Sequence, residues 1–270
     1  MIRLNSAKQI KMSNILDKII ANKKIEVVRQ KSLVSISELE KKITDIRINS
    51  FKAALADSPT GIIAEFKRRS PSRDWIFKDA EISDVIPLYS KNGASAISVL
   101  TDMDFFGGNL TDLVQARELT QTPLLRKDFM IDEYQLYQAR LAEASAILLI
   151  ASALTVQETK QLAAKAKELG LDVLLEIHSE QELGHINDKV DVVGVNNRNL
   201  GTFATDVQIS FDLADKIPGE FVKISESGIS QPQTVIELRQ AGYKGFLMGE
   251  NFMKTGNPGK ALEDFIKQLA

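Results

Sequence analysis

The sequence predicts an α/β fold in which eight parallel strands alternate with helices and close into a barrel. Eight short apolar segments recur along the chain, and segments with helical periodicity separate them. The apolar segments are hydrophobic on consecutive residues, which is typical of parallel strands covered on both faces. A length of 270 residues is also ordinary for one such barrel.

The predicted strands follow one another with a helical segment after each. They are Ile62–Phe66, Ala96–Leu100, Pro123–Leu125, Ala146–Ile150, Val173–Ile177, Val190–Val195, Phe221–Ile224 and Gly245–Met248. Leu154–Leu169 is a clear helix because its apolar residues recur on one side and Gly170 follows as a stop signal. Pro232–Ala241 is a second one, with Ser230 as its predicted N-cap. Pro87 predicts a kink or a late start in the helix after the first strand.

About 60 residues precede the first predicted strand. Ile15–Val34 has the spacing of a helix, and Ile36–Ile43 that of a second, shorter one. The apolar positions of the first helix are Ile15, Ile19, Ile20, Ile25 and Val28. No linker rich in Gly, Pro or Ser follows, so we expect one domain over 1–270, in which a helical extension (1–60) packs on the barrel (61–270).

An open, doubly wound sheet is the alternative that alternating strands and helices allow. Such sheets commonly carry a G-x-G-x-x-G loop after the first strand, but here that strand runs into Lys67-Arg-Arg-Ser-Pro71. The glycines of Gly256-Asn-Pro-Gly-Lys-Ala261 have the wrong spacing for a phosphate loop and follow no strand. We therefore expect a (β/α)8 TIM barrel with an N-terminal helical extension.

Composition argues against several classes of function. The 34 basic and 36 acidic residues give a net charge of −2, and no long block of like charge points to nucleic acid or an anionic membrane. The longest apolar run, Ala146–Ala151, is too short to span a bilayer, and the first residues show no signal peptide, so we expect a cytoplasmic protein. With no cysteine and two histidines, we expect neither thiol catalysis nor a metal site.

Polar and charged residues gather where the predicted strands end, the edge at which barrel enzymes carry their catalytic groups. They include Glu65, Lys67, Ser70, Lys127, Glu176, Asn196, Arg198, Glu226 and Ser227. Glu65 and Lys67 share one face of the first strand, and Lys127 and Glu176 end strands close enough to converge. Because buried charge is costly unless it is paired or used, both an active site and a network of structural ion pairs stay open.

Two glycines suggest a site for an anion. Gly228 and Gly249 begin loops that lead to helix N-termini, where free N–H groups and the helix dipole favour negative charge. Barrels frequently bind phosphate after their last two strands. Glycine also serves ordinary tight turns, so this pair alone does not decide the matter.

Six motifs at the strand ends together resemble the indole-3-glycerol-phosphate synthase family. They are Ala64-Glu-Phe-Lys-Arg-Arg-Ser-Pro71, Ser98-Val-Leu-Thr-Asp102, Leu125-Arg-Lys-Asp-Phe129, Leu175-Glu176, Gly194-Val-Asn-Asn-Arg-Asn-Leu200 and Ser225-Glu-Ser-Gly-Ile229. The match extends over about the whole chain. It implies a carboxy-lyase of tryptophan biosynthesis that converts 1-(2-carboxyphenylamino)-1-deoxyribulose 5-phosphate to indole-3-glycerol phosphate, CO₂ and water. The resemblance implies no cofactor and no metal.

The resemblance also implies catalytic roles. Lys127 would protonate the substrate carbonyl while the ring carbon attacks it, and Lys67 would pair with the anthranilate carboxylate or act as a second acid. Glu176 would be the base that completes dehydration, and Glu65 and Asn196 would hold the lysine and the hydroxyls in place. An ammonium donor suits this chemistry because ring closure places negative charge on a carbonyl oxygen. The residues leave open which lysine gives which proton.

The remaining implied site residues bind substrate: Arg198, Glu226 and Ser227 in the pocket wall, and Ser70, Gly228, Gly249, Glu250 and Asn251 around the phosphate. Two positions depart from the usual family pattern. Asp74 stands where glycine is common, which affects the loop after the first strand. Asn251 stands where serine is common, which replaces a hydroxyl by an amide at the phosphate.

Other classes of protein fit less well. A phosphoribosyl-anthranilate isomerase would be expected to have a catalytic cysteine, and a Schiff-base aldolase would need a lysine of depressed pKa. A non-catalytic barrel that partners another tryptophan-pathway enzyme would have no use for costly charges at its rim. Association of an active enzyme with other enzymes of that pathway stays open.

Three residues near the proposed site are expected to be structural or unremarkable. Arg126 and Asp128 flank Lys127 and should point the other way, as an ion pair. His178 follows Glu176 closely but has no partner visible in the sequence, so we expect a loop histidine.

Overall fold

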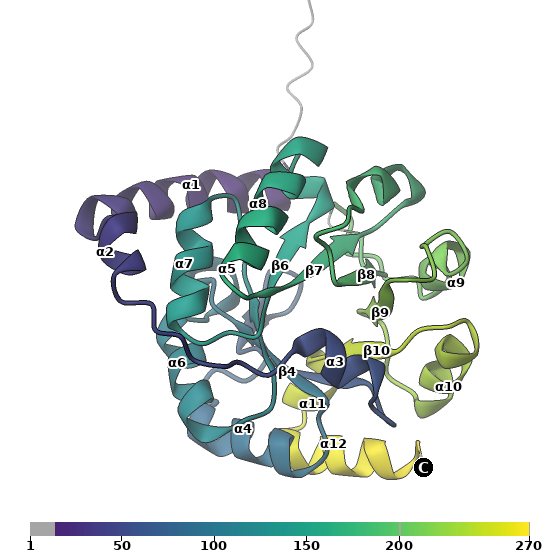
Figure 1. Ribbon diagram of the computed structural model, residues 1–270. Helices are drawn as coiled ribbons and strands as arrows, with labels where there is room; N and C mark the ends of the chain where they lie inside the picture. The colour runs from purple at the N-terminus through teal and green to yellow at the C-terminus, as the bar shows by residue number, and fades with distance from the viewer. Residues whose placement is uncertain (1–13, 200, 270) are drawn as a thin grey trace, which may run out of the picture.

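The computed structural model describes residues 14–199 and 201–269, and its centre is a closed barrel of eight parallel strands (Figure 1). The order around the barrel is β1-β10-β9-β8-β7-β6-β5-β4. The predicted (β/α)8 fold is therefore confirmed. The first thirteen residues of the predicted extension lie outside the described residues.

All eight predicted strands are present. Their bounds are Ile62–Phe66 (β1), Ala96–Leu100 (β4), Leu124–Lys127 (β5), Ala146–Ile150 (β6), Asp172–Ile177 (β7), Val192–Asn196 (β8), Val222–Glu226 (β9) and Gly245–Met248 (β10). Strands β5 and β9 each end two residues later than predicted because their polar ends still pair. Lys127 is in register with Leu100, and Glu226 with Asn196 and Leu247. The sequence did not predict the two-stranded hairpin of β2 (Arg69–Ser70) and β3 (Asp74–Trp75).

Helices surround the barrel (Figure 1). Their bounds are Ile15–Leu33 (α1), Ile36–Glu40 (α2), Phe51–Ala56 (α3), Ile82–Lys91 (α4), Met103–Phe106 (α5), Leu110–Leu119 (α6), Glu133–Leu141 (α7), Ala151–Ala153 (η1), Val156–Glu168 (α8), Glu180–His185 (η2), Gln208–Leu213 (α9), Pro232–Gln240 (α10), Glu250–Met253 (α11) and Pro258–Lys267 (α12). The two clear sequence helices correspond to α8 and α10. The N-cap of α10 is Gln231 rather than the predicted Ser230, and Pro87 lies inside α4. No helix in the described ranges is long and apolar enough to cross a membrane.

The N-terminal helix α1 forms as predicted, and only some of its predicted apolar positions pack against the barrel. It begins with a reciprocal capping box between Asn14 and Asp17. Ile25 and Val28, two of the predicted apolar positions, are 70% and 69% exposed. The buried residues of α1 are Leu16, Ile19, Lys23 and Val27. Its C-terminal half packs near α7, where Val27 joins a small cluster of buried residues (Figure 1).

A third helix of the extension, α3, was not predicted. It closes one end of the barrel because Phe51 and Leu55 are fully buried in the interior cluster and α3 contacts β4 and β9. Its six residues are too few to show a helical period, which is why the sequence pattern does not predict it.

Along four strands, a site residue lies two positions beyond a residue of the barrel interior. Ile63, Leu125, Leu174 and Ile224 belong to the interior cluster of the barrel. The residues two positions further along the same strands share their face and lie one step nearer the C-terminal end. Those residues are Glu65, Lys127, Glu176 and Glu226. The fold thus points four ionisable side chains into one opening.

Candidate active site

A cavity of about 390 Å³ opens at the C-terminal ends of the strands. Its lining includes every residue that the sequence assigned to the site: Glu65, Lys67, Ser70, Lys127, Glu176, Asn196, Arg198, Glu226, Ser227, Gly228, Gly249, Glu250 and Asn251. These residues come from β1, β5, β7, β8, β9 and β10 and the loops beyond them. The cavity is also lined by residues outside this set, among them Leu16 and Ile19 of α1.

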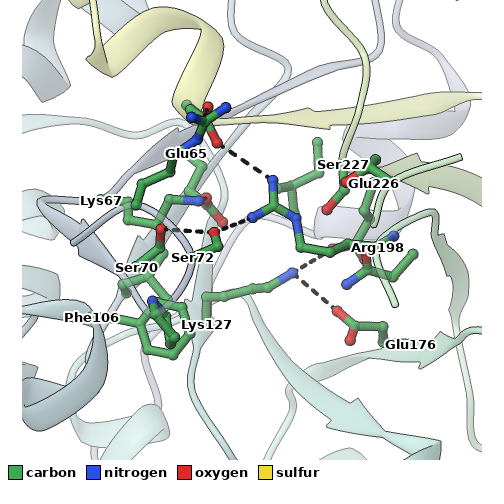
Figure 2. A pocket seen from close by; sticks show the side chains of 18 of the residues that line it. Glu65, Lys67, Ser70, Ser72, Phe106, Lys127, Glu176, Arg198, Glu226 and Ser227 are labelled. Atoms are coloured by element: carbon green, nitrogen blue, oxygen red, sulfur yellow. Dashed lines mark hydrogen bonds and ion pairs between the residues drawn. The ribbon is translucent and has the colours of Figure 1, made fainter. Parts of the chain in front are cut away.

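Lys127 lies at the centre of the charged cluster (Figure 2). Its ammonium donates to Glu226 Oε2 and lies 3.3 Å from Glu176 Oε2. Burial alone would lower the pKa of Lys127, but the carboxylates of Glu226, Glu176 and Glu65 outweigh it and raise that pKa well above its usual value. Lys127 is therefore a positively charged hydrogen-bond donor at neutral pH.

The two carboxylates that Lys127 contacts differ in their affinity for a proton. Burial and the nearby charges of Glu176 and Glu65 raise the pKa of Glu226 to about 7, although Lys127 opposes the shift. Burial would also raise the pKa of Glu176, but Lys127, His178 and the Asn196 amide lower it. Glu176 is thus the ionised carboxylate, suited to act as a base.

Glu65 of β1 and Lys67, which directly follows β1, form a second ion pair. Lys67 Nζ lies 2.5 Å from Glu65 Oε1, and the Glu65 side chain is 5% exposed. Gly249 makes room for this carboxylate, because a Cβ atom at position 249 would lie 2.4 Å from Glu65 Oε1. The absence of a side chain at Gly249, directly after β10, therefore has a role in placing Glu65 as well as in the predicted anion loop.

Hydroxyl and guanidinium groups lie beside the pair of Glu65 and Lys67 (Figure 2). Arg198 Nη1 donates to Ser72 Oγ at 2.5 Å, and Ser72 lies 3.4 Å from Ser70 Oγ. Arg198 and Arg73 both face Glu250, at 3.4 and 3.2 Å. The carboxylate of Glu250 thus neutralises two cations at the place where the sequence predicted the phosphate. Arg73, Ser72 and Lys254 line the cavity as well but were not singled out from the sequence.

The hairpin β2–β3 explains the departure at Asp74. This residue has φ +54°, a left-handed conformation that glycine adopts freely and that Asp tolerates better than most residues. Arg69 Nε donates to Asp74 Oδ1 at 2.7 Å and holds the aspartate in place. The backbone conformation that favours glycine is therefore kept here by an aspartate.

The turn after β9 also has left-handed backbone, with φ +67° at Ser227 and +74° at Gly228. A Cβ atom at position 228 would lie 2.5 Å from the Thr205 side chain. Asn197, which the sequence did not assign, donates from Nδ2 to Ser227 O at 3.0 Å and to Ser225 Oγ at 3.0 Å. Buried Asn197 therefore fixes the shape of this loop.

Arg126 and Asp128 form the ion pair that was predicted, at 3.0 Å, although Asp128 also borders the cavity. The sequence missed a third member, Lys23 of α1, which is fully buried. Its ammonium lies 2.9 Å from Asp128 Oδ1 and 3.0 Å from Asp102 Oδ2. Burial would raise the pKa of Asp128, but Arg126 and Lys23 lower it to about 2. An ion network thus ties α1 to the strand that carries Lys127.

His178 lies in the loop after β7, as predicted, but it has partners that the sequence did not reveal. Its Nε2 lies 3.4 Å from Glu176 Oε1, and its Nδ1 lies 3.5 Å from Glu182 Oε2. Burial would lower the pKa of His178, but the carboxylates of Glu182 and Glu176 raise it. Nothing in the sequence pattern shows that η2 folds back to place Glu182 there.

Comparisons with known proteins agree on one family. A family model described as indole-3-glycerol phosphate synthase matches residues 16–265. The chain is 55% identical over 259 residues to a curated protein of that name from Bacteroides thetaiotaomicron, covering 96% of this chain and 100% of the relative. It is 40% identical over 261 residues to another of the same name from Aliarcobacter butzleri, covering 94% and 99%.

Similar solved structures are more distant and show the fold alone. A mutant tryptophan synthase alpha-subunit from Pyrococcus furiosus aligns with a TM-score of 0.58 at 16% identity, covering 78% of this chain and 97% of that one. A thiamine phosphate pyrophosphorylase from the same organism aligns with a TM-score of 0.57 at 14% identity, covering 78% and 96%.

Proposed function

The chain belongs to the indole-3-glycerol phosphate synthase family, and from this premise we propose how its residues divide the work of the reaction. The protein is a carboxy-lyase of tryptophan biosynthesis that acts on a phosphorylated small molecule. It converts 1-(2-carboxyphenylamino)-1-deoxyribulose 5-phosphate to indole-3-glycerol phosphate, CO₂ and water. The assignment of roles rests on one observation above all, the contact of Lys127 with both Glu226 and Glu176 inside the cavity.

Lys127 is the proposed acid for ring closure. The ring carbon attacks the substrate carbonyl, negative charge develops on the oxygen, and a buried ammonium stabilises that charge more than water would. Three carboxylates raise the pKa of Lys127, so its proton is present before the substrate arrives. The same shift argues against a Schiff-base mechanism, which needs a neutral amine as nucleophile.

Glu176 is the proposed base for dehydration. It is 3% exposed, its pKa is lowered, and it lies on the same side of the cavity as Lys127. A carboxylate held ionised beside the acid can remove a proton from the intermediate after CO₂ has left. Asn196, whose amide helps to lower the pKa of Glu176, is proposed to orient it.

Lys67 is the proposed clamp for the anthranilate carboxylate. It is paired with Glu65, so the ammonium is held in one position before substrate binds. The carboxylate leaves as neutral CO₂, so a clamp should orient it without overstabilising the charged ground state. Because Lys67 is also paired with Glu65, it binds the substrate carboxylate less strongly, as the loss of CO₂ requires.

The substrate phosphate is proposed to bind near Ser70, Gly228 and the loop Gly249–Asn251. Arg198 and Arg73 supply positive charge there, and both face Glu250. A phosphate would compete with Glu250 for the two guanidinium groups. Ser227, Arg198 and Glu226 would then line the middle of the substrate.

The N-terminal extension is proposed to form one domain with the barrel. Leu16 and Ile19 contribute to the cavity wall, and Lys23 is buried against barrel carboxylates. Deleting the extension would therefore remove part of the substrate site and leave Asp102 and Asp128 short of a cation.

The cellular location of the enzyme and its protein partners are proposed from its family. A biosynthetic carboxy-lyase of this kind is expected in the cytoplasm, where association with other tryptophan-pathway enzymes is also open. Fluorescence microscopy of a tagged full-length chain tests the location, and a membrane or extracellular signal would contradict it. Co-sedimentation with purified enzymes of the pathway tests the association.

Indole fluorescence gives the direct test of activity. The purified chain, incubated with 1-(2-carboxyphenylamino)-1-deoxyribulose 5-phosphate, should produce the fluorescence of indole-3-glycerol phosphate. We expect excess EDTA to leave the rate unchanged because the proposed mechanism uses only side-chain acids and bases. Within the described ranges, no group of three His, Asp or Glu side chains is placed to hold a metal. A rate that EDTA abolishes and added zinc or magnesium restores would overturn the cofactor-free mechanism.

A further inference from the structure

His178 occupies a position behind the proposed base. It follows β7 on the same face as Glu176, yet it does not line the cavity. Both ring nitrogens are buried, and neither makes a hydrogen bond of normal geometry in the part of the chain that the structure describes. Instead each nitrogen faces one carboxylate oxygen at 3.4 to 3.5 Å. A buried imidazole aligned between two carboxylates is unexplained by the roles assigned so far.

The reaction itself has a requirement that the assigned groups do not meet. The substrate loses its carboxylate as neutral CO₂, and the negative charge of that group disappears without another replacing it. Ring closure places one proton on the carbonyl oxygen, and dehydration needs a second on the departing hydroxyl. Glu176 recovers only one proton. Each turnover therefore leaves the acid groups one proton short, and solvent must supply it.

We propose that His178 supplies this proton, passing it to Lys127 through Glu176. The inference rests on the proposed roles of Lys127 and Glu176. The N–H bond at His178 Nε2 breaks, its electron pair stays on the ring, and an O–H bond forms at Glu176 Oε1. Rotation of the carboxyl group about its Cγ–Cδ bond then carries the proton to the free amine of Lys127, whose Nζ lies 3.3 Å from Oε2. His178 regains its proton from water.

Glu182 has the role of holding the ring. It accepts a hydrogen bond from the His178 backbone N–H at 2.6 Å, and its Oε2 also faces Nδ1. A carboxylate at Nδ1 keeps a proton there and leaves Nε2 as the nitrogen that exchanges with Glu176. The charged groups around the ring are Glu176 on β7, Glu182 in η2 and Glu226 on β9, with Lys127 of β5 beyond Glu176. Three carboxylates against one ammonium favour the imidazolium that can give a proton.

The matched control is His185, at the end of η2. Its Nδ1 lies 2.9 Å from Thr159 Oγ1, it does not line the cavity, and it faces none of the groups above. His178→Ala and His185→Ala therefore remove the same side chain from the two ends of one short segment. Added imidazole distinguishes a role of the His178 ring in proton supply from a role in packing. When imidazole enters the space left by the ring, it restores the supply of protons.

The experiment measures kcat and KM of both variants, with and without imidazole. We expect His178→Ala to lower kcat about tenfold, less than the ~10²–10⁴-fold of a group that transfers its proton directly to substrate. KM should stay near the wild-type value, and imidazole should restore kcat severalfold. His185→Ala should keep wild-type kcat and show no response to imidazole.

Two results would overturn the inference. One is a His178→Ala variant that keeps kcat within about twofold of wild type, and the other is a folded variant of low kcat that imidazole does not restore. Either result would be obtained beside a wild-type chain that is active. Failure of the proposed function would instead appear as a wild-type chain that makes no indole-3-glycerol phosphate.

Discussion

The Glu226 side chain of β9 lies against Gly194 of β8, and a Cβ atom at position 194 would lie 2.5 Å from Glu226 Oε1. The same Glu226 binds Lys127 through its other carboxylate oxygen. The carboxylate is 1% exposed and has little space into which to move. The absence of a side chain at position 194 therefore helps to set the position of the proposed acid.

Gly194→Ala should disturb this arrangement. Displacing a buried carboxylate by one methyl group should cost about 1–3 kcal/mol of stability. It should also lower kcat, because Lys127 keeps only Glu176 of the two carboxylates that it contacts. Urea unfolding and steady-state kinetics measure the two effects. Gly219→Ala is the control, since nothing lies within 4 Å of a Cβ atom there. Equal kinetics for the two variants would contradict the proposed link.

Glu226→Gln should change how stability depends on pH. The pKa of Glu226 in the folded protein is about 7 against an ordinary value of 4.5, so the folded state binds the proton more tightly. The stabilising contribution is therefore full below pH 4.5 and is lost as the pH rises through 7. The shift corresponds to about 3 kcal/mol.

Urea unfolding at pH 5 and pH 8 checks this prediction. The wild type should lose more stability between the two values than Glu226→Gln, because the amide does not titrate. The variant should also be less active, since its amide is uncharged beside Lys127. A pH dependence that the substitution leaves unchanged would show that Glu226 does not titrate in this range.

Lys23→Met should destabilise the protein strongly. Among the described residues, Lys23 is the only cation that forms an ion pair with Asp102. The substitution removes this cation and leaves Asp128 paired with Arg126 alone. Removing one partner from a buried ion pair typically costs about 3–5 kcal/mol. Lys24→Met is the control, because Lys24 is exposed on the same helix. Chemical unfolding of both proteins gives the comparison, and a loss below about 1 kcal/mol for Lys23→Met would contradict the anchoring role.

The sequence predicted the barrel well because the strands carry their own signal. Continuous apolar runs mark all eight strands. The period of two places Glu65 and Lys67 on the inner side of β1 and Lys127 on the inner side of β5. The residues around the cavity were recognisable because each follows a strand end. The late ends of β5 and β9 were missed because charged residues there do not look like a buried strand.

What the sequence could not predict depends on contacts between distant segments. Lys23 looks like a solvent-exposed lysine in a helix, and its partners Asp102 and Asp128 come from two different strand ends. His178 meets Glu182 only because η2 folds back on the end of β7. Ile25 and Val28 have the spacing of buried positions in α1 but are exposed, since apolar side chains can also lie on a surface.

The central claim is that Lys127 is the acid for ring closure, and Lys127→Met tests it most directly. Methionine keeps the unbranched chain and removes the donor. We expect kcat to fall by about 10²–10⁴-fold, while substrate still binds through its phosphate and carboxylate. The control is Lys223→Met, because Lys223 of β9 donates to Ala214 O and does not line the cavity. If Lys127→Met kept more than about a tenth of the wild-type kcat, the acid would be another group, with Lys67 the next candidate.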